Sequence, residues 1–240
     1  MRLLLWNLNH RVSKKVIPPL TVSAITAARP DVLVLTEYVE GPSHEWFVRE
    51  LDDAGLSHVL ISAEFEGNNR VLIAARRPLF PGPLQAPPLD SSSPPNSLHV
   101  VVPELELNVL GIRMPAFEGR GAGRLRNAWW DWMAEAAATI REGQAVLAGD
   151  LNTDPERRGP SGGIRLQRLV ASGWRRALPL DGHSWWDLRG RGYRLDHVFV
   201  TPTLELIGAE YVTRFGDHQL VGRKNGFSSD HAALLVDVQS

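Results

Sequence analysis

The sequence predicts a single α/β domain that is rich in β-strands. Short apolar segments with strand character recur along all 240 residues, and helical patterns separate them. Residues 77–95 are rich in proline and serine, but similar strand patterns continue on both sides, which indicates a loop rather than a domain linker. We therefore expect residues 1–240 to form one domain, because large β-rich folds reach this length without dividing.

Composition narrows the class of protein. The chain contains no cysteine, so disulfides and thiolate metal sites are excluded and any metal must be held by oxygen or imidazole ligands. The apolar start at residues 1–6 is too short for a signal peptide or a membrane span, which predicts a cytoplasmic protein. The net charge of −1 argues against strong non-specific binding to nucleic acid. We expect a monomer with no membrane partner.

The chain opens with a predicted strand over residues 2–9, whose apolar side chains alternate between two buried faces. This alternation places Asn7 and Asn9 on one face of the strand. A helix over residues 20–28 follows, with Ser13 or Thr21 as its N-cap and a proline after its end.

The next predicted strand, residues 31–37, is apolar until it reaches Glu37. An acid at that position is either the first solvent-exposed residue after a strand or a ligand held at the edge of the core. A helix over residues 44–54 and a hairpin of residues 57–63 and 70–75 complete this part of the chain.

The second half continues the pattern of strands and helices. A strand over residues 105–112 leads into Arg113, and a helix over residues 124–141 carries three tryptophans at helical spacing, which indicates core packing. Further strands are expected at residues 98–102, 194–202, 204–212 and 232–238, and a further helix at residues 164–172.

Two acidic motifs follow or precede apolar strands. The run Ala145–Leu147 predicts a strand that ends in a turn carrying Asp150 and Asn152. If the extended conformation continues through Asn152, both side chains point to one face, although such a pair also suits ordinary turn chemistry. The dipeptide Asp230-His231 precedes the last strand, where a structural pair and a catalytic pair are both reasonable interpretations.

Polar or charged residues stand at the ends or beginnings of six predicted strands: Asn7, Glu37, Arg113, Asp150 with Asn152, Asp196, and Asp230 with His231. Such side chains bind a hard cation and a phosphate. This ordered set resembles the endonuclease/exonuclease/phosphatase superfamily, which includes exonuclease III and DNase I. The likeness rests on Trp6-Asn7, Thr36-Glu37, Gly149-Asp150-Leu151-Asn152-Thr153, Arg194-Leu195-Asp196 and Ser229-Asp230-His231.

The resemblance implies a four-layer α/β/β/α sandwich in which two mostly antiparallel sheets pack face to face with helices outside. It also implies a Mg²⁺ site, with Mn²⁺ as a possible substitute, in which Glu37 is the principal ligand beside Asn7 and Asp230.

The resemblance assigns catalytic roles as well. Asp150 would orient or deprotonate the attacking water, and Asn152 would hold that water and a phosphate oxygen. His231, steadied by Asp196, would stabilise charge on the phosphate or transfer a proton. The implied reaction is hydrolysis of a phosphate ester by in-line attack.

Two positions depart from the commoner pattern of that superfamily. Asn9, a candidate substrate-binding residue, stands where many nucleases have a second acid near the metal, which implies a weaker or single-metal site. Arg113 stands where tyrosine or histidine is usual; it can donate two hydrogen bonds to a phosphate but cannot exchange a proton at ordinary pH. Its charge slightly favours a more negative substrate. Arg120, Arg124 and Arg126 form either a substrate-binding rim or a solvated face.

The sequence thus predicts a metal-dependent phosphoesterase acting on phosphodiester bonds in nucleic acid, DNA or RNA. The alternative within the same chemistry is a small phosphorylated molecule or a lipid headgroup. An alternative of another class is a binding protein that keeps the fold and has lost activity through Asn9 and Arg113. Membrane-surface action through Trp129, Trp130, Trp185 and Trp186 is a third possibility, and we do not expect it.

Overall fold

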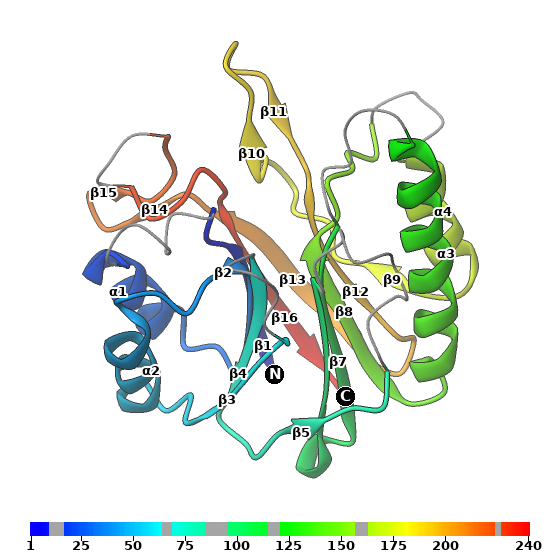
Figure 1. Ribbon diagram of the computed structural model, residues 1–240, viewed down its shortest axis with the longest axis horizontal. Helices are drawn as coiled ribbons and strands as arrows, with labels where there is room; N and C mark the ends of the chain where they lie inside the picture. The colour runs from blue at the N-terminus through cyan, green and yellow to red at the C-terminus, as the bar shows by residue number, and fades with distance from the viewer. Residues whose placement is uncertain (10–16, 64–68, 85–95, 115–120, 157–162, 224–226) are drawn as a thin grey trace.

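A computed structural model describes residues 1–9, 17–63, 69–84, 96–114, 121–156, 163–223 and 227–240. Within these residues, two six-stranded sheets pack face to face and helices cover their outer faces (Figure 1). This arrangement is the four-layer α/β sandwich that the resemblance implied. Two residues named in the sequence predictions, Ser13 and Arg120, lie outside the described residues.

The first sheet joins both ends of the chain and has the strand order β13-β16-β1-β2-β4-β3. Every neighbouring pair is antiparallel except β1 with β2. Its strands are β1 (Arg2–Asn7), β2 (Val32–Tyr38), β3 (His58–Ile61), β4 (Arg70–Ala75), β13 (Glu205–Val212) and β16 (Ala233–Gln239).

The second sheet has the order β5-β6-β7-β8-β12-β9, and only β7 and β8 are parallel. Its strands are β5 (Phe80–Pro81), β6 (Ser97–Val102), β7 (Leu107–Arg113), β8 (Gln144–Asp150), β9 (Arg175–Arg176) and β12 (Asp196–Val200). Two short ribbons lie outside the sheets: β10 (Trp185–Trp186) with β11 (Gly192–Tyr193), and β14 (Arg214–Phe215) with β15 (His218–Gln219).

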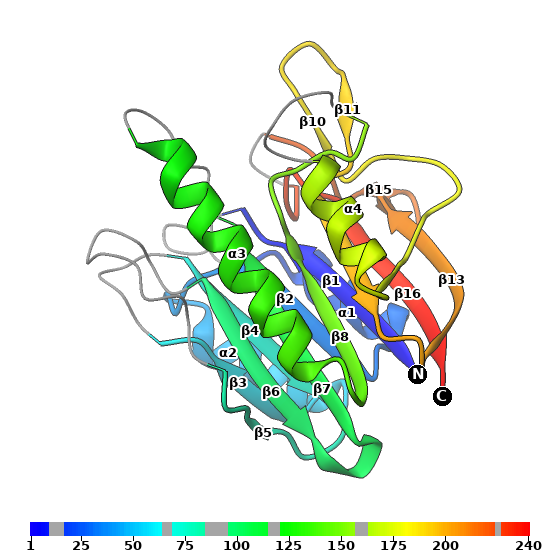
Figure 2. The same cartoon turned by 90° about the vertical axis from the view of Figure 1, so that its right-hand side faces the viewer.

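Helices α1 (Pro19–Ala28) and α2 (His44–Asp53) cover the first sheet, and α3 (Ala122–Ile140) and α4 (Gly163–Ala171) cover the second (Figures 1 and 2). A short 3₁₀ helix, Pro103–Leu105, replaces the beginning of the strand predicted at residues 105–112. The other predicted strands and helices are confirmed to within a few residues at their ends.

Three apolar clusters fill the three interfaces between the four layers. Alternation along β1 divides its side chains, because Leu5 faces the other sheet while Trp6 packs with the residues beneath α1 and α2. The third cluster lies between the second sheet and α3, where Trp129 and Trp130 are buried as predicted. Burial of these two tryptophans removes them from any membrane-surface role. None of the described helices has both the length and the apolar character needed to cross a bilayer.

One local prediction is wrong, and two alternatives that the sequence left open are excluded. Thr21 does not cap α1, because the helix begins at Pro19 and Thr21 is buried within it. Glu37 is not the first exposed residue after a strand, because it lies inside β2 and its exposed fraction is only 7%. Asn7 and Asn9 do not share a strand face, because β1 ends at Asn7 and Asn9 has a left-handed φ of 55°.

Candidate active site

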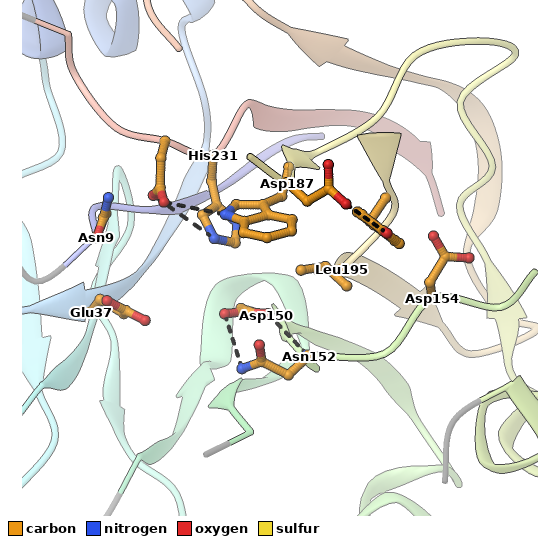
Figure 3. A pocket seen from close by; sticks show the side chains of 11 residues that line it. Asn9, Glu37, Asp150, Asn152, Asp154, Asp187, Leu195 and His231 are labelled. Carbon is orange, nitrogen blue, oxygen red and sulfur yellow. Dashed lines mark hydrogen bonds and ion pairs between the residues drawn. The ribbon is translucent and has the colours of Figure 1, made fainter. Parts of the chain in front are cut away.

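The predicted site residues converge at one end of the sandwich, where central strands of both sheets end. A cleft of about 450 Å³ opens there (Figure 3). Its described lining comprises Asn9, Glu37, Asp150, Asn152, Asp154, Trp185, Asp187, Tyr193, Leu195, Asp230 and His231. Six predicted site residues, Asn9 among them, are therefore in its wall. The side chains of Asn7, Arg113 and Asp196 each contact a residue of that wall.

Left-handed backbone at three positions turns side chains toward this cleft. Asn9, Glu37 and Asn152 have φ angles of 55°, 53° and 46°. Asparagine tolerates this conformation, whereas a glutamate there is unusual and marks a functional position in many proteins. At Glu37 the pairing of β2 with β4 shifts its register, so a bulge aims the carboxylate into the site.

The same conformation changes the explanation of the Asp150 and Asn152 pair. Strand β8 ends at Asp150, so the two side chains do not share a strand face as predicted. Instead the turn folds back: the Asn152 N–H donates to Asp150 Oδ1 at 2.9 Å, and Asn152 Nδ2 lies 3.4 Å from Asp150 Oδ2. Asn152 Nδ2 also donates to the Met114 carbonyl at 2.7 Å, which fixes its amide. Turn chemistry and a shared site therefore coexist in these residues.

Asp150 is the buried centre of the site, with an exposed fraction of 1%. Its Oδ2 accepts a hydrogen bond from Asn7 Nδ2 at 2.9 Å, which links the two sheets. Burial, together with the neighbouring Asp196 carboxylate, raises the pKa of Asp150 to about 7. A carboxyl group with such a pKa is suited to accept a proton near neutral pH.

Asp196 and His231 form a buried pair beside Asp150. His231 Nδ1 lies 2.7 Å from Asp196 Oδ2, and Asp196 stands opposite Asp150 in the β8–β12 register. Burial alone would lower the pKa of His231, but the charge of Asp196 and the hydrogen bond to it raise that pKa to about 10. The pair favours an imidazolium, and the His231 Nε2 at the cleft lies 4.0 Å from Asp230 Oδ1.

Glu37 and Arg113 form an ion pair across the two sheets. Arg113 Nη2 and Nε donate to Glu37 Oε1 at 2.8 and 3.1 Å. Arg113 is the last residue of β7 and stands beside Asp150 in the parallel register of β7 and β8. The predicted phosphate contact and the predicted metal ligand therefore bind each other in this structure.

The oxygen donors of the site fit a hard divalent cation. Glu37 and Asp230 line the cleft. Oδ1 of Asp230 is buried with no hydrogen-bond partner in the part of the chain that the structure describes, and His231 Nε2 lies 4.0 Å from it as an ion-pair partner. Among the described residues, no three His, Cys, Asp or Glu side chains gather as a metal-binding group. Two carboxylates and a nearby amide suit Mg²⁺, which retains waters and takes oxygen ligands from its substrate.

The two described arginines of the predicted rim lie elsewhere. Arg124 and Arg126 are in the first turns of α3, and neither belongs to the lining of the cleft. Arg124 is exposed, as on a solvated face. The structure does not bring these residues to the catalytic groups.

Sequence reasoning missed two serines that hold the site together. Ser229 Oγ donates to the Asn7 carbonyl at 2.5 Å and accepts the His231 N–H at 3.0 Å. Ser184 Oγ accepts the N–H groups of Leu195 and Asp196 at 2.8 and 3.1 Å. Ser229 belongs to the motif Ser229-Asp230-His231, so the sequence does carry a signal for it. No motif marks Ser184.

The wall formed by β10 and β11 was also missed. Trp185 Nε1 donates to Asp230 Oδ2 at 3.2 Å, and its ring lies 6.5 Å from that of His231. Tyr193 follows on β11, and its hydroxyl donates to Asp187 Oδ2 at 3.2 Å. Two-residue strands give too short a pattern to be recognised from sequence.

Comparisons with known proteins agree with this fold. The sequence model described as the Endonuclease/Exonuclease/phosphatase family matches residues 4–231. No curated protein gives a significant match to the sequence.

Similar solved structures include an AP endonuclease from Archaeoglobus fulgidus, with a TM-score of 0.76 and 15% identity, and a 3′-5′ exonuclease from Neisseria meningitidis, with 0.74 and 20%. A mannosyl-6-phosphatase from Bacteroides thetaiotaomicron has a TM-score of 0.68 and 13% identity. Each of these matches covers 100% of both chains. At such identities the likeness shows the fold alone.

Proposed function

Because the chain belongs to the Endonuclease/Exonuclease/phosphatase family, we propose that it is a Mg²⁺-dependent phosphoesterase that hydrolyses phosphodiester bonds in nucleic acid. The observation that carries this proposal is the joint placement of Asp150, Asp196 and His231. Asp150 and Asp196 face each other across β8 and β12, and His231 is bonded to Asp196 at 2.7 Å. A base and an acid thereby lie side by side at the floor of one cleft.

In the proposed reaction, Asp150 accepts a proton from the attacking water while Asn152 orients that water. The water oxygen forms a bond to phosphorus as the bond to the leaving oxygen breaks. The Nε2–H of His231 donates to a phosphate oxygen and stabilises the negative charge that builds there. Glu37, Asp230 and Asn7 would hold Mg²⁺, which supplies neutralisation of phosphate charge and assistance to the leaving oxygen.

Nucleic acid is the first substrate class to test because two of the similar structures are described as an AP endonuclease and a 3′-5′ exonuclease. Purified protein should be incubated with single-stranded, double-stranded and abasic DNA, with RNA, and with a chromogenic phosphodiester. Each substrate is tested with Mg²⁺, Mn²⁺ or EDTA. We expect cleavage of at least one nucleic acid, and its loss in EDTA.

A phosphorylated small molecule is the second candidate, and Arg113 favours it. A guanidinium near the phosphate suits a dianionic monoester better than a singly charged diester. Cleavage of small phosphate esters without cleavage of any nucleic acid would replace the first proposal with this one.

Two variants separate catalysis from binding alone. Asp150→Asn should lower kcat by about 10³-fold or more and His231→Ala by about 10²-fold or more, since each removes a proton-transfer or charge-stabilising group. Asp187→Asn is the matched control, because that carboxylate also lines the cleft but is bonded to Arg189 and Arg191 of its own hairpin. Wild-type activity in both of the first two variants would contradict the mechanism.

A further inference from the structure

The ion pair of Glu37 and Arg113 is built into the site by its backbone. Both side chains are largely buried, with exposed fractions of 10% and 17%. The left-handed bulge fixes Glu37, while the Arg113 N–H donates to the Asn96 carbonyl at 2.8 Å and fixes the end of β7. The pair is therefore not a casual contact between mobile surface chains.

The geometry of the pair concentrates positive charge on one carboxylate oxygen. Two N–H groups of the guanidinium donate to the same atom, Glu37 Oε1. A divalent cation on that oxygen would stand within a few ångströms of the guanidinium, where two cations in a partly buried site repel each other strongly. Arg113 and a metal ion therefore compete for Glu37.

The other oxygen donors near Glu37 do not supply the negative charge that the guanidinium offsets. Asn9 is neutral and lines the cleft, and Asn7 already donates to Asp150 and accepts the Asn9 N–H at 2.7 Å. Two carboxylates, Glu37 and Asp230, then provide two negative charges. The guanidinium offsets that of Glu37, and His231, whose Nε2 lies 4.0 Å from Asp230 Oδ1, offsets part of the other. A phosphate oxygen from the substrate would restore the missing negative charge and give Arg113 a new partner.

We propose that Arg113 is an internal competitor that keeps metal affinity low until a phosphate arrives. Metal binding displaces the guanidinium from Glu37, and the released guanidinium binds the phosphate. Metal and phosphate therefore bind cooperatively, each raising the affinity for the other. This inference rests on the proposed function only in taking Glu37 as a metal ligand.

The test measures Mn²⁺ binding in the absence of substrate. The electron paramagnetic resonance signal of free Mn²⁺ reports how much of the ion remains unbound. Arg113→Gln should lower the Kd for Mn²⁺ by about tenfold or more, because it removes a positive charge beside the ligand. Arg113→Lys retains the charge and should bind Mn²⁺ about as weakly as the wild type. Arg113→Met is a second neutral replacement for use if the Gln variant does not fold.

Arg165→Gln is the matched control. Arg165 forms an ion pair with Asp131 at 2.8 Å and has the same exposed fraction as Arg113, 17%, but it lies on α4 away from the cleft. Its replacement should leave the Kd for Mn²⁺ unchanged.

Unchanged or weaker Mn²⁺ binding in folded neutral variants of Arg113 would overturn the inference. Addition of inorganic phosphate should also lower the Kd for Mn²⁺ several-fold more in the wild type than in Arg113→Gln, and an equal effect in both would contradict the cooperative step. Glu37→Gln tests separately whether Glu37 is a metal ligand. If this variant loses Mn²⁺ binding while the Arg113 variants bind Mn²⁺ like the wild type, the proposed function is retained and competition by Arg113 is excluded.

Discussion

At the scale of single residues, Ser229 connects the end of β1 to the segment that precedes β16. Its hydroxyl joins the carbonyl of Asn7, at the end of β1, to the N–H of His231 before β16. All three residues are buried. Loss of this hydroxyl leaves two buried backbone groups without a partner, and buried unpaired groups are costly.

We predict that Ser229→Ala lowers the free energy of unfolding by roughly 2 kcal/mol or more and kcat/KM by about tenfold. Urea unfolding and steady-state kinetics measure the two effects. The adjacent Ser228→Ala is the control: Ser228 is also buried, but its hydroxyl has no hydrogen-bond partner in the described structure. Equal losses in both variants would show that serine packing, rather than the bridge of Ser229, is responsible.

At the scale of elements, the parallel pair β7 and β8 sets the distance between Arg113 and Asp150. Gly149 stands opposite Ile112 in this pair, and a Cβ added to Gly149 would lie 1.7 Å from the Ile112 carbonyl oxygen. Only glycine fits there, so the close approach of the two strands depends on it.

Gly149→Ala should therefore force the two strands apart, lowering the free energy of unfolding by roughly 2 to 3 kcal/mol and reducing kcat through displacement of Asp150. Thermal unfolding and kinetics check both effects. Gly143 precedes the same strand, and a Cβ added there meets nothing within 4 Å. Gly143→Ala should therefore change neither the free energy of unfolding nor kcat appreciably. A Gly149→Ala variant as stable as Gly143→Ala would be inconsistent with this packing.

Elements with long, regular sequence patterns were predictable. Very short strands, and features that depend on contacts between distant segments, were not. The apolar runs of β2 and β8 predicted both strands, and Glu37 and Asp150, near their ends, indicated the candidate site. The left-handed turns at Glu37 and Asn152 were not predictable, because they depend on the bulge and on bonds to neighbouring strands. The contact of Arg113 with Glu37 joins two sheets, and no local pattern encodes such a distance.

At the scale of the whole molecule, both sheets contribute to one apolar cluster and to the candidate active site. Asn7 of the first sheet bonds Asp150 of the second, and the cluster between the sheets draws on both. We therefore propose that the chain is one domain and predict a single unfolding transition, with tryptophan fluorescence and circular dichroism coinciding in urea. Two separate transitions would indicate two domains.

The acid stability of that single unit depends on His197. This side chain is buried and its Nε2 lies 2.8 Å from the Thr153 carbonyl; burial lowers its pKa to about 4. The folded state thus binds a proton less readily than the unfolded state. The resulting stabilisation is complete above pH 6.5 and is lost as the pH falls from there toward about 4.

Between pH 7 and pH 4, the wild type should lose roughly 3 kcal/mol more of its free energy of unfolding than His197→Gln, which keeps an amide donor but does not titrate. Urea unfolding at a series of pH values measures both curves. All other groups titrate in both proteins, so parallel curves would exclude His197 as the source.

The bond between Ser229 and Asn7 spans 222 positions of the sequence, and Trp6 donates to the His231 carbonyl across 225. Residues of the first strand and residues just before the last strand are thus both required to form this wall of the cleft. During synthesis on the ribosome, the growing chain displays its first strand long before His231 is made. A growing chain therefore cannot complete this wall of the cleft until residues 229–231 have been made and β16 has paired with β1.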